Sequence, residues 1–288
     1  MQAIPALVRW HEGNPVRGVI FLAIAQANRP RFAELVRLGT DAMMPENSQK
    51  PVSIGSLAQS LDQPKETVRR HVSRLVTLGL CARQRNLGYV VTEAATQSPQ
   101  FVEFAAATSL GFLRMLRDLR AIGLDVAGGS TGGRLMATDP AVQHVIFDFL
   151  LRLVESGAPP HDGDMLRAYV FSAIMWANAR PYTHDREGAW KYATLAQSPP
   201  DDLRLPVTNL EVSAITGVPR ETVRRHVLAM VADRDLIRVR GRGVINPTVS
   251  PRDGRLHEAG AAVTSRFMQM LGDLRRLGFD YGALDSVD

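Results

Sequence analysis

The residues of this sequence that are best suited to recognition chemistry are arginines in a segment that occurs twice. Glu66–Val72 reads ETVRRHV, and the same seven letters recur at Glu221–Val227, 155 positions later. An arginine guanidinium carries a fixed charge and a planar set of donors, so it can bind guanine or phosphate through two hydrogen bonds. Seven consecutive identities predict that one recognition surface is present twice in the chain.

Helical periodicity places the arginines of this segment on an outward face. At 100° per residue, Val68, Val72 and Leu75 fall on one side of the helix, and Arg70 lies nearly opposite them. The second copy repeats this arrangement around Arg225. The major groove of B-DNA admits an α-helix, so a helix that packs through one face and presents arginine on the other suits that groove.

The elements that must position this helix are expected in the same order in both copies. The first copy predicts a short helix over Ser56–Leu61, a turn over Asp62–Pro64, the arginine-bearing helix over Lys65–Leu78 and a hairpin from Leu80 to Thr92. Pro64 suits the first helical position, and Gly79 suits a helix end. A helix, a turn, a second helix and a hairpin together predict a winged helix.

Longer helices are expected on both sides of each predicted winged helix. Their ranges are Gly18–Asn28 and Phe104–Ile122 in the first copy, and Met165–Asn178 and Ala259–Leu277 in the second. We expect the Arg-Pro pairs at Arg29–Pro30 and Arg180–Pro181 to end the two upstream helices, because a residue that precedes proline disfavours helical backbone angles.

The repeat predicts how the chain is divided. A first winged-helix repeat with flanking helices is expected over residues 15–126, and a second over residues 164–281. Residues 127–163 form the expected linker, which contains a bridging helix over Pro140–Glu155. The predicted fold class is therefore mainly α with small β wings, built as a tandem duplication of winged helix-turn-helix domains with accessory helices.

The segment from Thr67 to Leu80, TVRRHVxxLxxxGL, resembles the recognition-helix signature of bacterial winged-helix regulators of the GntR, ArsR and MarR types. The resemblance covers roughly 40 residues in each copy and implies sequence-specific binding of double-stranded DNA. The second copy departs from the signature where Arg234 and Asp235 replace the glycine and one residue is inserted before Leu236.

The basic charge of the chain is concentrated on the two expected DNA-binding segments, residues 63–86 and 218–243. The chain has 34 basic and 29 acidic residues, a net charge of +5. Residues 63–86 carry +5 and residues 218–243 carry +4, so the remainder is acidic overall. This distribution is expected for phosphate binding. The predicted DNA-binding residues are Lys65, Thr67, Arg69, Arg70, Ser73, Arg74, Arg83, Arg85, Arg220, Thr222, Arg224, Arg225, Arg238, Arg240 and Arg242.

The two expected wings differ in charge. Arg238, Arg240 and Arg242 alternate with other residues, so a strand would place their guanidinium groups on one side, along a phosphate backbone or in a minor groove. The first wing offers Arg83 and Arg85, followed by Asn86 and Tyr89.

Several other residues could belong to a catalytic or ligand site, but a structural role is the stronger expectation for each. Gly128–Gly132 has the letters of a nucleophile elbow without a preceding strand, so we expect a linker there. His71 and His226 are expected to pack or to hydrogen-bond phosphate, and Cys81 to be a small buried residue. We expect no catalytic site, no cofactor and no metal. A set of large side chains is expected in a helix core, with an effector pocket as the alternative: Phe147, Phe149, Phe171, Met175 and Trp176.

Composition narrows the class of protein. The 45% apolar and 22% charged residues fit a globular chain, and the longest apolar run, Val19–Ala25, is too short to span a membrane. No leader pattern at Met1–Gly13 and a single cysteine predict a cytoplasmic, nucleoid-associated protein without a membrane partner.

The predicted function is a transcriptional regulator that acts as a single-chain pseudo-dimer on double-stranded DNA. A plasmid-type replication initiator and a protein-interaction scaffold are the alternatives. Homodimer formation and a small-molecule effector stay open.

Overall fold

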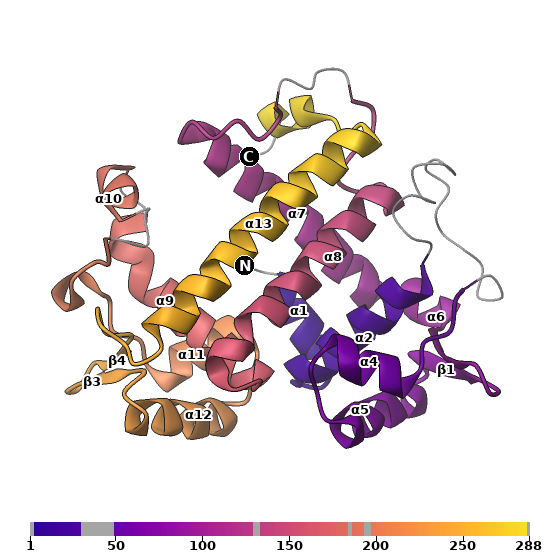
Figure 1. The fold of residues 1–288 in the computed structure, drawn as a ribbon, viewed down its shortest axis with the longest axis horizontal. Coiled ribbons are helices and arrows are strands. Elements are labelled where there is room, and N and C mark those ends of the chain that lie inside the picture. The colour runs from indigo at the N-terminus through magenta and orange to yellow at the C-terminus, as the bar shows by residue number, and fades with distance from the viewer. Residues whose placement is uncertain (1–2, 30–48, 129–132, 184–185, 193–196, 287–288) are drawn as a thin grey trace. The chain divides into compact units, whose positions relative to one another are not determined.

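The structure is a computed structural model, and it describes residues 3–29, 49–128, 133–183, 186–192 and 197–286. The chain is mainly helical, with two small antiparallel hairpins (Figure 1). It divides into two compact units. Unit 1 contains residues 1–155 and 263–288, and unit 2 contains residues 156–262. The coarse fold class expected from the sequence is therefore confirmed.

Unit 1 contains most of the N-terminal half of the chain and the C-terminal segment. Its elements in chain order are α1 (Ala3–Trp10), α2 (Pro15–Asn28), α4 (Ile54–Ser60), α5 (Lys65–Thr77), β1 (Cys81–Gln84), β2 (Gly88–Val91), α6 (Glu93–Thr96), α7 (Pro99–Ala121), most of α8 (Pro140–Gly157), the last part of α13 (Asp253–Leu277) and η4 (Tyr281–Ser286). Helices are present at each range expected in this part of the chain; α7 begins five residues before the expected start at Phe104, and α8 covers the expected range Pro140–Glu155.

Unit 2 repeats part of this order. Its elements are η2 (Pro159–His161), α9 (Met165–Thr183), α10 (Arg186–Lys191), η3 (Asp201–Leu203), α11 (Asn209–Thr216), α12 (Arg220–Ala232), β3 (Ile237–Val239), β4 (Gly243–Ile245) and the first part of α13. No helix in the described ranges combines the length and the apolar content that a membrane span requires.

The two arginine-bearing helices begin and end alike. Pro64 and Pro219 are the residues directly before α5 and α12, so Pro64 precedes its helix instead of taking the first helical position, and each helix has 13 residues. After α5, Gly79 has φ +72°, and after α12 the equivalent Arg234 takes φ +63°. Arg234 therefore adopts the left-handed backbone that the glycine adopts in the first copy, although a side chain disfavours it.

One expected helix end is wrong. The helix α2 ends at Asn28, before the Arg-Pro pair, but α9 continues through Pro181 to Thr183. Proline removes only one backbone donor, and Pro181 lies in the last turn, where few further hydrogen bonds depend on it. Pro30 lies outside the described residues.

Each hairpin carries a short third pairing. Val52 pairs with Tyr89 on β2, and Val207 pairs with Val244 on β4. A Cβ atom at Gly88, where φ is +136°, would meet the carbonyl oxygen of Val52, so only glycine fits there. Gly243 stands in the same relation to Val207, with φ +120°.

A buried asparagine fixes each hairpin to the preceding helix. Asn28 at the end of α2 donates through Nδ2 to the carbonyls of Lys50 and Tyr89, at 2.8 and 3.1 Å, and accepts from the Val91 amide at 2.9 Å. These three hydrogen bonds use nearly the full capacity of a buried amide, so they fix the hairpin relative to the helix.

Asn178 on α9 makes the equivalent hydrogen bonds in unit 2. Its Nδ2 donates to the carbonyls of Leu205 and Val244, and its Oδ1 accepts from the Asn246 amide. The partners in unit 2 lie 155 positions after their counterparts in unit 1.

The core of unit 1 joins helices from distant parts of the sequence. Phe112 and Leu116 of α7, Ile146 of α8, and Leu271 and Leu274 of α13 are buried in one cluster. The two long helices that the sequence pairs as equivalents, α7 and α13, thus both contribute to this core.

Candidate nucleic-acid interface

The helix α5 packs through the face that its periodicity indicates. Val68, Val72 and Leu75 are fully buried, whereas Arg69, Arg70, Ser73 and Arg74 are exposed. Lys65 is also exposed, and Thr67 is half-buried. Figure 1 shows α4, α5 and β1 close together within unit 1. The outward face of α5 is therefore exposed within unit 1.

The cations on this face differ in how they are paired. Glu66 lies 3.3 Å from Arg69, and Glu12 binds Arg74. Arg70 and Lys65 make no ion pair with another residue in the part of the chain that the structure describes. Among the described residues, Arg70 is thus the arginine at the centre of the face whose guanidinium has no carboxylate partner.

The helix α12 in unit 2 has the same construction. Val223, Val227 and Met230 are buried, and Arg225 is exposed without an ion pair to any described residue. Arg224 donates to Glu221 through two atoms, at 2.8 and 2.7 Å. The remaining predicted residues on this helix are an exposed Arg220 and a half-buried Thr222.

The hairpins carry the other predicted arginines. Arg83 lies on β1 opposite Tyr89, and Arg85 follows the strand; both are exposed. Asn86 turns the chain with φ +60°. Leu87 beside it is 65% exposed, an apolar residue at the tip that sequence reasoning did not single out.

The sequence predicts that a strand places Arg238, Arg240 and Arg242 on one side of the second wing, and this is correct only for Arg238, the one of the three that lies on a strand. β3 ends at Val239, so Arg240 and Arg242 lie in the turn around Gly241, where φ is +71° and side chains no longer alternate as in a strand. All three arginines are nevertheless exposed, and none pairs with a carboxylate among the described residues. The turn therefore presents a cluster of cations.

A buried ion network holds the end of α12 and was not found from the sequence. Asp235, 1% exposed, accepts from Nε of Arg252 at 2.7 Å and from Nη2 of Arg167 at 2.6 Å. Arg252 also donates to Asp162 at 3.0 Å, and Arg167 to Asp233 at 2.6 Å. The network joins α12 to α9 and to the start of α13, so the orientation of the arginine-bearing helix depends on it.

The histidines of the two motifs lie at the edge of the packed face. Burial, together with the charges of Arg70 and Arg17, lowers the pKa of His71 to about 4, so its ring is neutral at pH 7. Burial also lowers the pKa of His226, whose Nδ1 lies 3.8 Å from Asp164. For His71 the buried position favours the packing interpretation.

The other sequence candidates have mixed outcomes. Cys81 is buried, and burial raises its pKa to about 12. Of the five residues expected in a helix core, the three phenylalanines are buried, but Met175 and Trp176 are each 41% exposed, so that prediction is wrong for these two. The guanidinium of Arg180 lies 4.4 Å from the centre of the Trp176 ring. Gly129–Gly132 lie outside the described residues.

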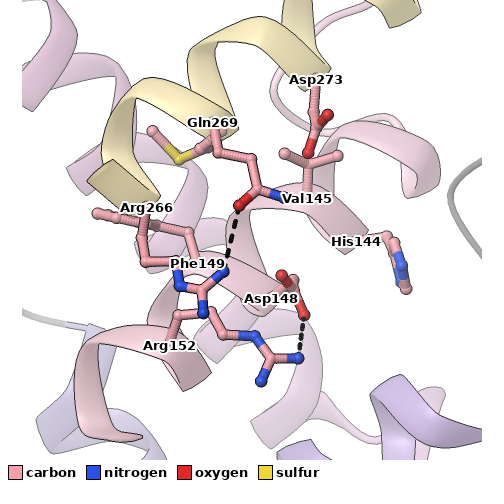
Figure 2. A pocket seen from close by; sticks show the side chains of 9 residues that line it. His144, Val145, Asp148, Phe149, Arg152, Arg266, Gln269 and Asp273 are labelled. Carbon is pink, nitrogen blue, oxygen red and sulfur yellow. Dashed lines mark hydrogen bonds and ion pairs between the residues drawn. The ribbon is translucent and has the colours of Figure 1, made fainter. Parts of the chain in front are cut away.

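A small cavity lies between α8 and the last part of α13 in unit 1 (Figure 2). Arg152 donates to Asp148 at 3.3 Å, and Arg266 donates to Gln269 at 3.3 Å. The cavity volume is about 50 Å³, which holds one or two waters and is far below that of an effector site. Its lining residues are His144, Val145, Asp148, Phe149, Arg152, Arg266, Gln269, Met270 and Asp273.

Comparisons with protein-family models, with curated proteins and with solved structures find no match to this chain.

Proposed function

We propose that this protein is a sequence-specific regulator of transcription that binds double-stranded DNA through two winged helix-turn-helix heads in one chain. The observation that carries the proposal is the recurrence of one exposed arginine, Arg70 on α5 and Arg225 on α12, at the centre of the outward face of a helix that packs through its opposite face. In each unit a two-stranded hairpin with exposed arginines follows that helix.

Adjacent arginines on each helix differ in whether they have a glutamate partner, and we assign them different roles in DNA binding on that basis. Arg69 and Arg224 each have a glutamate partner, whose negative charge offsets the positive charge that the arginine offers to a phosphate. Arg70 and Arg225 keep the full fork of donors that a bidentate contact to guanine needs. They read base edges, whereas Lys65, Arg220 and the hairpin arginines bind phosphates.

The matched contacts in the two units support an origin by tandem duplication. Asn28 and Asn178 hold their hairpins by the same three hydrogen bonds, and Gly88 and Gly243 make the same close approach to a valine carbonyl. Two heads on one chain act as a homodimer would, since linkage raises the effective concentration of the second head when both engage one site.

Selection of bound fragments from the organism's own DNA, followed by anisotropy titrations on a selected site, tests the proposal. We expect log K to fall with log salt at a slope of about −5 to −8, since nine of the predicted DNA-binding cations, four on the two helices and five in the hairpins, are exposed and have no carboxylate partner among the described residues. Arg70→Ala should cost about 1 to 3 kcal/mol on the selected site.

The matched control is Arg9→Ala, because Arg9 is an exposed arginine of unit 1 that lies on α1 and pairs with Glu103 of α7. Affinity that is insensitive to salt, or an equal loss in both variants, would contradict the proposal. Sites that cluster at a replication origin rather than at promoters would favour an initiator instead.

A further inference from the structure

Glu12 of unit 1 lies outside α5 but binds an arginine of α5, the helix that we propose reads DNA bases. Glu12 lies in the turn between α1 and α2, where its φ of +56° turns the chain. Arg74, in the last turn of α5, donates through Nε to Glu12 at 3.1 Å and through Nη2 to the second carboxylate oxygen. The contact uses both oxygens of Glu12 and one edge of the guanidinium, so it is a bidentate pair.

A second arginine holds Glu12 in place. Arg17 in the first turn of α2 also donates to Glu12, and it donates to the carbonyl of His11 at 3.2 Å. The Arg17 side chain is only 13% exposed. Hydrogen bonding from Arg74, reinforced by Arg17, lowers the pKa of the Glu12 carboxyl to about 2, so the carboxylate is charged throughout the physiological range.

The corresponding acid in unit 2 does not contact its reading helix. Asp162, 150 positions after Glu12, binds Arg252 and Arg255, and Ala229 occupies the position that corresponds to Arg74. Among the described residues, a carboxylate from the turn before α2 or α9 therefore restrains an outward arginine in unit 1 but not in unit 2.

We propose that Glu12 is a specificity-determining residue that withholds Arg74 from the phosphates of non-specific DNA. This inference rests on the proposed function. Non-specific affinity arises almost wholly from phosphate neutralisation, so each arginine that is engaged by a carboxylate removes one such contact. With Arg74 engaged, binding by unit 1 depends more on Arg70, whose contacts to base edges differ between sequences.

Glu12→Gln tests the proposal, because the amide keeps the shape of the side chain but removes its charge. On random-sequence duplex, the variant should bind roughly twofold to fivefold more tightly than the wild type, with a salt slope steeper by about 0.9. Affinity for the selected site should rise less, so the ratio of specific to non-specific affinity falls. Arg74→Ala combined with Glu12→Gln should cancel the gain.

Glu103→Gln is the matched control. Glu103 is an exposed glutamate of unit 1 that pairs with Arg9 at 3.6 Å, so this variant makes the same change in net charge away from α5. If the wild type binds DNA with a steep salt slope, but Glu12→Gln and Glu103→Gln behave alike, the role of Glu12 is refuted while the proposed function stands. Absence of DNA binding by the wild type would refute both.

An independent readout is the Nε–H resonance of Arg74 in a ¹⁵N spectrum of the free protein. We expect an ordered, slowly exchanging signal in the wild type and its loss in Glu12→Gln. A mobile Arg74 in the wild type would overturn the proposal whatever the titrations show.

Discussion

Removal of the Asp235 carboxylate should destabilise unit 2 selectively. Asp235 is 1% exposed and receives hydrogen bonds from Arg167 and Arg252, whose side chains are 12% and 10% exposed. Asp235→Ala leaves two largely buried guanidinium groups without their shared partner. Loss of one partner from a buried pair costs about 3 to 5 kcal/mol.

The lower end of that range applies here. Arg167 keeps Asp233 as a partner and Arg252 keeps Asp162, so neither cation is left fully uncompensated. We therefore expect a loss of about 3 kcal/mol in the free energy of unfolding of unit 2, which moves its urea midpoint by about 1 to 2 M.

Urea unfolding combined with hydrogen exchange measured by mass spectrometry separates the two units. Peptides from α12 should lose protection in Asp235→Ala, whereas peptides from α5 should keep it. Asp202→Ala is the control, because Asp202 is an exposed aspartate of the same unit. A midpoint within about 0.3 M of the wild type, or an equal loss of protection in both helices, would refute the structural role of the network.

Two further predictions concern the hairpins and the motif histidine. Gly88→Ala and Gly243→Ala should each detach a hairpin from its third pairing, because the added Cβ meets a valine carbonyl oxygen; unchanged exchange rates at the Tyr89 or Val244 amide would contradict this. In the folded protein the pKa of His71 is about 4, below the ordinary value of 6.5 that it has in the unfolded chain. His71 therefore binds a proton more readily when the chain is unfolded. Stability should therefore be greatest above about pH 6.5 and fall as the pH decreases toward 4, and His71→Gln should reduce that fall in a series of melting temperatures; an identical pH profile in the variant would exclude His71 as the cause.

The arginine-bearing helices could be predicted from the sequence because their signals are local. Apolar residues at helical spacing, a proline at the start and a glycine at the end determine α5 to within one residue at each end. The exact recurrence of the motif then placed α12 in the same way, and the turn residues around Asn86 indicated the hairpin.

The contacts that orient these helices could not be predicted, because they join residues far apart in the chain. Asp235 has partners 17 and 68 positions away, and an aspartate next to a helix end normally indicates an exposed turn. Arg17 and Arg167 occur at the same place in the two copies, 150 positions apart, which is a usable signal for a structural arginine. Sequence alone did not show that Arg74 is engaged by Glu12.

A footprint of the single chain on its selected DNA site tests whether the chain has two working DNA-binding heads. We expect protection of two related but non-identical half-sites, because Arg70 and Arg225 are equivalent in the two helices, whereas Arg74 in α5 corresponds to Ala229 in α12. Arg70→Ala should weaken protection of one half-site, and Arg225→Ala should weaken protection of the other. Protection of a single half-site at saturation, or the same half-site weakened by both variants, would contradict two working heads.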